Sequence, residues 1–287
     1  MSGFVAIHHV KFDALRPHIA KAAEVIKDYT AIFSFNDGSF GSGTFVNIGG
    51  FTGILTAHHV AEHLGRFADF VLIVADYAHR LEATARTVEH VAIGSPPSNG
   101  APETGPDLSL LVFRNPTLVE AIQSEKLFYN MDFAHADPLS APTMPMIWAV
   151  AGTFADSFRR ITEDYHGEPL SKLQNFVGTG DFRYETWADD FDYIRLTVPA
   201  GESGFPCHYE GLSGGGFWMI PMEVDATGDL NTLGHRPPLL TGVQFAQSER
   251  ENGERVLTGH GFNSIGPNLR ENLKARTSSL YPLPGGR

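Results

Sequence analysis

The chain has 287 residues and a formal net charge of −12, with 33 acidic against 21 basic side chains. This acidic balance argues against a nucleic-acid partner, because binding to phosphates requires a basic surface. The single cysteine, Cys207, excludes an intrachain disulfide and favours a reducing compartment, so we expect a cytoplasmic protein. Residues 1–9 lack the features of a signal peptide, and no apolar run is long enough for a membrane span.

Residues 1–28 form a separate N-terminal helical segment in this interpretation. Apolar residues recur at helical spacing across 14–29, which predicts an amphipathic helix packed on the body of the protein. A helix that binds a partner protein is the alternative. The apolar positions are Leu15, Ile19, Ala22, Val25 and Ile26.

Residues 29–125 are expected to form a first β-barrel. Short apolar or alternating runs follow one another here, separated by Gly, Pro, Asn and Asp, which is typical of antiparallel strands joined by turns. The six predicted strands are 30–35, 43–48, 53–57, 70–75, 87–93 and 108–113.

Residues 126–145, which include three prolines within 134–145, are expected to link the first barrel to a second one at 146–287. A polar loop at 225–238 interrupts the second set of strands. A C-terminal helix over 267–276, with Asn263 or Ser264 as its N-cap, ends the predicted fold. The predicted strands are 146–150, 176–179, 193–198, 216–220, 239–245 and 256–261. The fold class is therefore all-β, with two antiparallel six-stranded β-barrels and a helix at each end.

The glycine-rich run Gly211–Gly216 contains the most informative residue of the chain, Ser213. Glycines permit positive φ angles and can turn backbone N–H groups toward one point, as a binding site for an oxyanion requires. The run leads directly into the apolar segment 217–220. This pattern indicates a nucleophilic serine in a tight turn.

Two further motifs precede this serine, each attached to an apolar run. Thr56-Ala57-His58-His59 ends one predicted strand, and Asp107 begins another. The resulting order His, Asp, Ser resembles the chymotrypsin-like serine peptidases over roughly residues 29–265. The glycine-rich strand that begins at Gly41 also looks like the strand before the histidine in that family.

The resemblance implies a serine endopeptidase that forms an acyl-enzyme, with a protein or peptide as substrate, a regulatory protein as a possible partner, and no cofactor or metal. Ser213 is then the nucleophile, His59 the general base and Asp107 the carboxylate that orients the imidazole. The backbone N–H groups of Gly211 and Ser213 match the oxyanion hole. His58 competes with His59 for the role of base, but the family pattern Thr-Ala-x-His selects the second histidine.

The resemblance also implies where the substrate side chain binds. The base of the primary pocket lies about six residues before the serine, at Cys207 and His208, and later strands supply Gln244 and His260. No aspartate lies at this base, so a buried Lys or Arg of the substrate would have no counter-charge. We expect small, apolar or polar substrate residues, or acidic ones if His208 or His260 faces the pocket.

Leu212 stands where digestive members of the family carry an acidic residue that receives a new N-terminal ammonium group. No Ile-Val-Gly-Gly start follows a basic residue near the N-terminus either. Activation through that ion pair is therefore not expected.

Three other interpretations of the same residues remain. His59-Val60-Ala61-Glu62-His63 fits the H-x-x-E-H pattern of a zinc hydrolase. Gly211–Gly215 fits the G-x-S-x-G elbow of an α/β-hydrolase, with His260 as base and Asp225 or Asp229 between, although that elbow needs a helix after the serine. A catalytically silent binding module with the chymotrypsin-like fold is the third.

Overall fold

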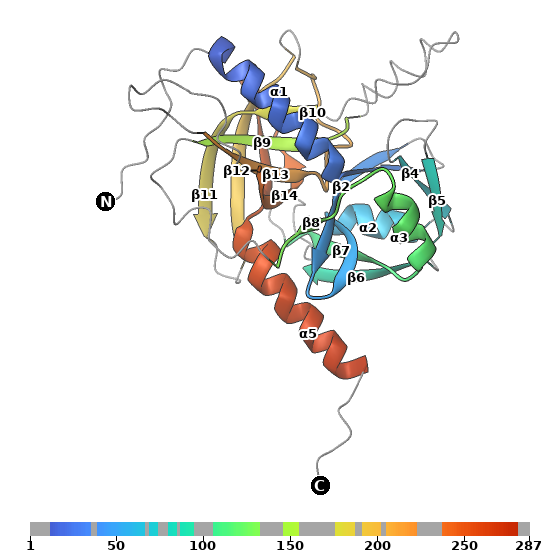
Figure 1. Cartoon of the computed structure of the whole chain (residues 1–287). Helices are drawn as coiled ribbons and strands as arrows, with labels where there is room; N and C mark the ends of the chain where they lie inside the picture. Colours follow the sequence, from blue (N-terminus) through green and yellow to red (C-terminus); the bar gives the residue numbers. More distant parts are fainter. Residues whose placement is uncertain are drawn as a thin grey trace, which may run out of the picture.

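The structure of the chain is a computed structural model that describes residues 12–35, 39–66, 69–73, 80–84, 87–94, 106–132, 146–154, 176–186, 191–201, 205–222 and 237–280. About half of these residues form two curled β-sheets, one from each half of the chain, with a long helix near either end (Figure 1). Most of the expected linker and polar loop, at 133–145 and 223–236, lies outside the described residues, as do Asp225 and Asp229.

The first sheet has the strand order β5-β4-β1-β2-β3-β7-β6, in which all neighbours are antiparallel, and the short β8 pairs with β2 in parallel. The interior strand β7, between β3 and β6, is buried at every position, because the sequence Leu-Ser-Leu-Leu-Val-Phe lets both of its faces pack against apolar side chains. The strands are β1 (Thr30–Ser34), β2 (Phe40–Ile48), β3 (Phe51–Thr56), β4 (Asp69–Ile73), β5 (Arg80–Thr84), β6 (Val88–Gly94), β7 (Leu108–Phe113) and β8 (Tyr129–Asn130).

The second sheet has the order β10-β9-β13-β14-β15-β12-β11 and is antiparallel throughout. Buried and partly exposed residues alternate along β12 and β15, as expected for strands with one face on the core. The strands are β9 (Met146–Gly152), β10 (Phe176–Thr179), β11 (Asp181–Thr186), β12 (Asp192–Pro199), β13 (Gly216–Pro221), β14 (Leu239–Gln247) and β15 (Glu254–His260).

The expected fold class is confirmed: the protein is all-β, with two antiparallel half-barrels in the chymotrypsin-like arrangement. Each predicted run contains a strand, but six strands per sheet was too few. The prediction missed β5, β8 and β11. The strands β5 and β11 are edge strands, and edges need little apolar character, so their sequences give a weak strand signal.

The two sheets share one apolar core, to which both terminal helices contribute. Ile19, Ala22 and Ile26 of α1 (Phe12–Tyr29) pack there, which confirms the expectation that this helix docks on the body. Leu269 and Leu273 of α5 (Leu269–Leu280) pack against the same core. Beyond that contact α5 points away from the sheets (Figure 1).

The expected N-cap of the C-terminal helix is wrong. Asn263 and Ser264 lie inside a helical turn that continues through η2 (Ser264–Asn268), a π-helical segment, into α5. The buried carboxylate of Asp192 in β12 accepts hydrogen bonds from Asn263 N at 2.9 Å and Ser264 N at 2.7 Å. A distant carboxylate therefore satisfies the N–H groups that a local side chain usually caps.

Two short helices were not predicted. α2 (His58–Gly65) follows β3 directly, and α3 (Pro116–Gln123) begins after Asn115, whose side chain accepts a hydrogen bond from Thr117 N. Asn at the N-cap and Pro at the first helical position are common helix starts. None of the helices in the described part of the chain has the length and apolar character needed to cross a membrane.

Candidate active site

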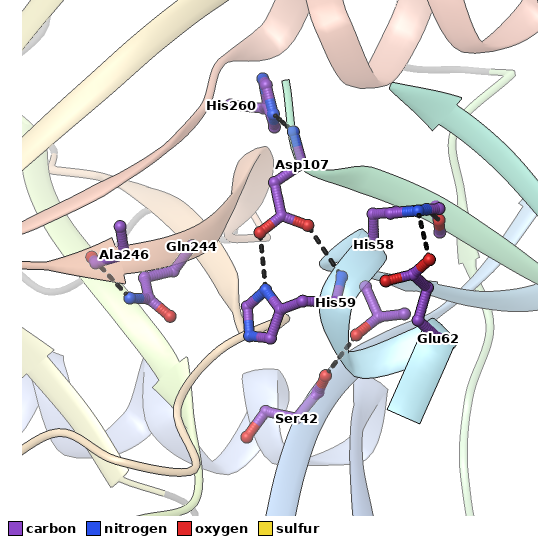
Figure 2. A network of polar contacts seen from close by, with 10 residues as sticks. Ser42, His58, His59, Glu62, Asp107, Gln244, Ala246 and His260 are labelled. Atoms are coloured by element: carbon purple, nitrogen blue, oxygen red, sulfur yellow. Dashed lines mark hydrogen bonds and ion pairs between the residues drawn. The ribbon is translucent and has the colours of Figure 1, made fainter. Parts of the chain in front are cut away.

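The pairing of β3 with β7 brings the histidine motif to Asp107. Thr56 lies opposite Ser109 in this antiparallel pair, so the residues after Thr56 meet the residues before Ser109. His59 Nδ1 lies 2.6 Å from Asp107 Oδ2, and His59 N donates to Asp107 Oδ1 at 2.9 Å (Figure 2). Both oxygens of one carboxylate therefore hold the same histidine, through its ring and through its main chain.

This geometry sets the chemistry of the imidazole. Asp107 is 1% exposed, whereas the side chain of His59 is 44% exposed. A carboxylate acceptor at Nδ1 selects the tautomer with the proton on Nδ1, which leaves Nε2 on the exposed side with a free lone pair. His59 can therefore accept a proton at Nε2 while Asp107 stabilises the cation that results.

The turn that contains Ser213 is hydrogen-bonded at almost every peptide unit. Leu212 N donates to Tyr209 O, Gly214 N to Gln244 O, and Gly215 N to Leu212 O. Within the described residues, the N–H groups of Gly211 and Ser213 make no hydrogen bond. These are the two donors that the sequence suggested for an oxyanion hole.

Glycine is required at two positions of this turn. Gly211 has φ +90° and Gly214 has φ +89°, which is the left-handed region where other residues are strained. A Cβ on Gly214 would also lie 2.0 Å from Ser42 O and 2.1 Å from Thr56 Oγ1. The turn therefore packs directly on Thr56, three residues before His59.

Ser42 in β2 joins the serine turn to both sheets. Its Oγ donates to Gly211 O at 2.7 Å and its N donates to Ser213 O at 2.9 Å. The same Oγ accepts from Thr153 N at 2.9 Å, and its carbonyl accepts from Thr56 Oγ1 at 2.7 Å. Because Ser42 holds two carbonyl oxygens of the turn, it restricts the directions in which the neighbouring N–H groups point. Sequence reasoning treated residue 42 only as part of a glycine-rich strand.

The hydroxyl of Ser213 is half-buried and makes no hydrogen bond within the described residues, to His59 or to any other group. Catalytic hydrogen bonds are often long in structures without substrate and shorten only when substrate is bound. The serine turn therefore meets the histidine motif through the close approach of Gly214 to Thr56.

His58 has a different environment from His59. It is buried, its Nδ1 lies 2.9 Å from Ser109 Oγ, and its Nε2 lies 3.5 Å from Glu62 Oε1. The Nε2 of His90 shares the same Ser109 hydroxyl at 2.9 Å. His58 is therefore part of a separate polar cluster, and Figure 2 shows its ring beside Glu62.

The zinc interpretation is not supported. His59 turns to Asp107, whereas His63 lies 3.0 Å from Ser39 Oγ and packs edge-on against Phe35. Glu62 faces His58 instead of a shared point between the two rings. In the part of the chain that is described, no cluster of three His, Cys, Asp or Glu residues could hold a metal ion.

The α/β-hydrolase interpretation is wrong. A strand, β13, follows the serine turn where that interpretation needs a helix. His260 lies in β15 with 0% exposure, and its Nε2 accepts a hydrogen bond from the backbone N–H of Asp107 at 2.8 Å. A base for Ser213 would need to reach the serine, and His260 is occupied behind the carboxylate (Figure 2).

Of the four residues expected to bind substrate, two are exposed and two are buried. Cys207 and His208 are exposed, as a substrate-binding segment requires. Gln244 is buried, with its Nε2 donating to Ala246 O at 2.8 Å and its Oε1 unpaired. His260 is wholly buried, so the expectation that it faces a substrate pocket is not met in this structure.

The segment with Cys207 and His208 is held from behind by Arg255. This buried guanidinium donates from Nε to Cys207 O at 2.9 Å, and its Nη2 lies 2.9 Å from His208 Nδ1. Its Nη1 donates to Ser248 O. None of the described carboxylates pairs with Arg255. Sequence reasoning did not identify this cation.

Leu212 is fully buried in the core of the second sheet, and its Cδ1 lies 2.7 Å from where a Cβ on Gly152 would be. The neighbouring residue of Ser213 is thus anchored by apolar packing. A buried leucine cannot form the ion pair that an acidic residue would make at this position, in agreement with the sequence analysis.

No protein-family model and no curated protein matches the chain. Among solved structures, the thermostable serine protease AL20 from an extremophilic microorganism is 14% identical, with 90% of this chain and 99% of that chain covered and a TM-score of 0.47. The HtrA-type protease AlgW is 15% identical, with 91% and 62% covered and a TM-score of 0.43. The protease Anisep from Arthrobacter nicotinovorans is 14% identical, with 81% and 87% covered and a TM-score of 0.40. These likenesses carry no weight for the chemistry of the site, and the fold assignment rests on the strand pairing above.

Replacing Ser42 by Ala should destabilise the protein. The change removes the hydroxyl that pairs with Gly211 O and Thr153 N, and leaving buried polar groups unpaired costs about 1–3 kcal/mol of unfolding free energy. Urea unfolding measures this loss. The control is Ser124→Ala, whose exposed hydroxyl bonds Ala121 O and whose loss should cost less than about 0.5 kcal/mol. Equal effects of the two changes would contradict the role given to Ser42.

Acid should destabilise the protein through His260. Burial lowers the pKa of this imidazole from 6.5 to about 4, against the weaker opposing effects of Asp107 and Asp192. The unfolded chain therefore takes up this proton first, and its contribution to stability is lost progressively as the pH falls from about 6.5 to about 4.

The size of this loss is testable with a variant that does not titrate. Between about pH 7 and about pH 4.5, wild type should lose roughly 2 kcal/mol more unfolding free energy than His260→Gln, on the scale of about 1.4 kcal/mol for each pKa unit. Urea unfolding at both pH values gives the comparison. Parallel losses in the two proteins would show that His260 is not kept neutral by the fold.

Proposed function

We propose that the chain is a serine endopeptidase in which Ser213, His59 and Asp107 form the catalytic triad. One observation carries this proposal. Within the described residues, the N–H groups of Gly211 and Ser213 make no hydrogen bond, and their turn packs on Thr56, three residues before a histidine whose ring is bonded to a buried carboxylate. Oriented base, hydroxyl and convergent donors are the three requirements of acyl transfer through an oxyanion.

The mechanism follows from these groups. Ser213 Oγ attacks the carbonyl carbon of the peptide bond while His59 Nε2 takes its proton, and Asp107 stabilises the imidazolium. The N–H groups of Gly211 and Ser213 bind the oxyanion of the tetrahedral intermediate. His59 then gives the proton to the leaving amine, which releases it and leaves an acyl-enzyme. Water, with His59 again as the base, hydrolyses the acyl-enzyme and restores the serine.

A catalytically silent binding module is the second candidate, and the observation in its favour is that the Ser213 hydroxyl makes no hydrogen bond to His59. The arrangement of Asp107 and His59 favours the enzyme, because a binding module has no need of a buried carboxylate that fixes one imidazole tautomer. A fluorophosphonate probe separates the two candidates, since it reacts only with an activated serine.

Wild-type protein should be labelled by a fluorophosphonate at Ser213, and Ser213→Ala should remove both the label and peptide cleavage. Loss of an activated nucleophile lowers kcat by about 10⁶-fold. Mass spectrometry of the labelled peptide and a protein substrate such as casein give the two readouts. Full turnover by purified Ser213→Ala would overturn the assignment, and a wild type that neither reacts nor cleaves would support the binding module.

The two adjacent histidines should differ sharply. His59→Ala should be as damaging as Ser213→Ala, whereas His58→Ala should keep its rate within about tenfold, because the His58 ring bonds Ser109 and it is the His59 ring that bonds Asp107. Asp107→Asn should cost about 10⁴-fold in kcat through the wrong imidazole tautomer. Initial rates, normalised to the folded fraction by circular dichroism, give the comparison. Greater damage from His58→Ala would show that the register of the histidine motif is wrong by one residue.

Substrate recognition is proposed at the exposed segment of Cys207 and His208, with Gln244 beside the serine turn. The Arg255 guanidinium behind this segment places a positive charge next to it, and no described carboxylate neutralises that charge. A cationic substrate side chain would be repelled there, whereas a polar or acidic one would not.

Cleavage after Lys or Arg should therefore be disfavoured. On a mixed peptide library, cleavage after Glu, Asp or small polar residues should exceed cleavage after Lys or Arg by at least about tenfold, which corresponds to about 1.4 kcal/mol of discrimination. Mass spectrometry of the products gives the ratio, and Arg255→Gln should reduce it. Dominant cleavage after Lys or Arg would show that a carboxylate such as the exposed Glu210, or Glu202, lines the pocket.

A further inference from the structure

His260 is a buried titratable group that the proposed mechanism does not use. It lies in β15, in register with Tyr193 of β12 and Val243 of β14, so it belongs to the second sheet. Within the described residues, the only hydrogen bond of its ring is to the first half of the chain: Asp107 N donates to His260 Nε2 at 2.8 Å, across 153 residues of sequence. Figure 2 shows that Asp107 contacts a different histidine at each end: its carboxylate bonds His59, and its main-chain N–H donates to His260.

The environment of the ring leaves no other reason for an imidazole at this position. Phe191, Tyr193 and Phe245 surround it, with ring centroids 5.2, 5.2 and 4.9 Å away. A bond accepted at Nε2 places the proton on Nδ1, and Nδ1 is buried without a partner. A phenylalanine would pack in the same apolar space without an orphaned donor, so the acceptor at Nε2 is what the histidine supplies.

That acceptor acts on the residue that orients the proposed base. Asp107 lies between Pro106 and the start of β7, and its backbone N–H is buried, so it needs a partner that the first sheet does not supply. A shift of this backbone moves both carboxylate oxygens relative to the ring and main chain of His59. A misplacement of about 1 Å in a catalytic group is enough to cost about 10²-fold in rate.

We propose that His260 is the positioning residue of Asp107: from the second barrel, it holds the carboxylate of the triad in place through the main-chain N–H. This rests on the proposed catalytic role of Asp107. The charged groups that face the ring are the carboxylates of Asp107 and Asp192, and both are already bonded elsewhere, to His59 and to the start of the C-terminal helix. Neither carboxylate bonds Nδ1, so the ring stays neutral and keeps its lone pair on Nε2.

A matched pair of amide variants tests the proposal. The side-chain oxygen of His260→Gln reaches the position of Nε2, whereas that of His260→Asn is one methylene too short. His260→Phe keeps the ring shape and removes the acceptor. Thermal unfolding of all three proteins distinguishes a variant that fails to fold from one in which only the Asp107 carboxylate is displaced.

We expect kcat to fall by about 10²-fold in His260→Asn and His260→Phe, with KM changed less than about threefold, and to recover to within about threefold of wild type in His260→Gln. A merely structural role would make activity follow the folded fraction and would not distinguish Asn from Gln. Equal kcat in the Asn and Gln variants, or wild-type kcat in a folded Phe variant, overturns the proposal.

A second measurement does not depend on catalysis. Hydrogen exchange of the Asp107 amide, followed by NMR, should be slow in wild type and His260→Gln and at least about tenfold faster in His260→Asn. Equal protection in Asn and Gln variants overturns the hydrogen bond itself. If wild type neither cleaves peptides nor reacts with a fluorophosphonate, the proposed function fails, and the exchange data still decide whether His260 holds Asp107.

Discussion

The three hydrogen bonds from Ser42 to the second half of the chain are the constraint on which the site depends. Ser42 lies in β2 of the first sheet, yet its hydroxyl and its N–H hold Gly211 O, Ser213 O and Thr153 N. These bonds fix the separation of the two sheets at the point where the serine turn crosses between them. Under the proposed function, Ser42 thereby holds the N–H donors of the serine turn in place before the reaction, so that they need no reorganisation when charge develops.

The parts of the site that the sequence predicts are those encoded in short motifs. His59, Asp107 and the glycine-flanked Ser213 each lie next to an apolar run, so local patterning marks both the strand and the candidate residue. Strand register then brings His59 to Asp107, because Thr56 pairs with Ser109. The core strands of both sheets are predicted for the same reason, since their apolar runs are continuous or alternate clearly.

The parts that the sequence does not predict depend on contacts between distant residues. The Ser42 hydroxyl and its partner Gly211 are 169 residues apart, and no local pattern indicates that they meet. His260 was expected near a substrate because later strands line the pocket in the family that the chain resembles, whereas aromatic neighbours from two other strands bury it. The Asp192 carboxylate likewise contacts a residue far away in the sequence, since it accepts a hydrogen bond from Asn263 N, 71 residues later. The edge strands β5 and β11 were missed because an edge tolerates polar residues that a central strand excludes.

Because the site is distributed over both sheets, it cannot form until most of the chain has been synthesised. Synthesis delivers His59 and Asp107 first, while Ser213, His260 and the backbone that holds them emerge later. Since each cross-sheet bond closes a loop of more than a hundred residues, these contacts form late in folding, after local turns and hairpins. Under the proposed function, a half-made chain therefore holds the base and its carboxylate without the nucleophile, and it cannot yet cleave a peptide bond.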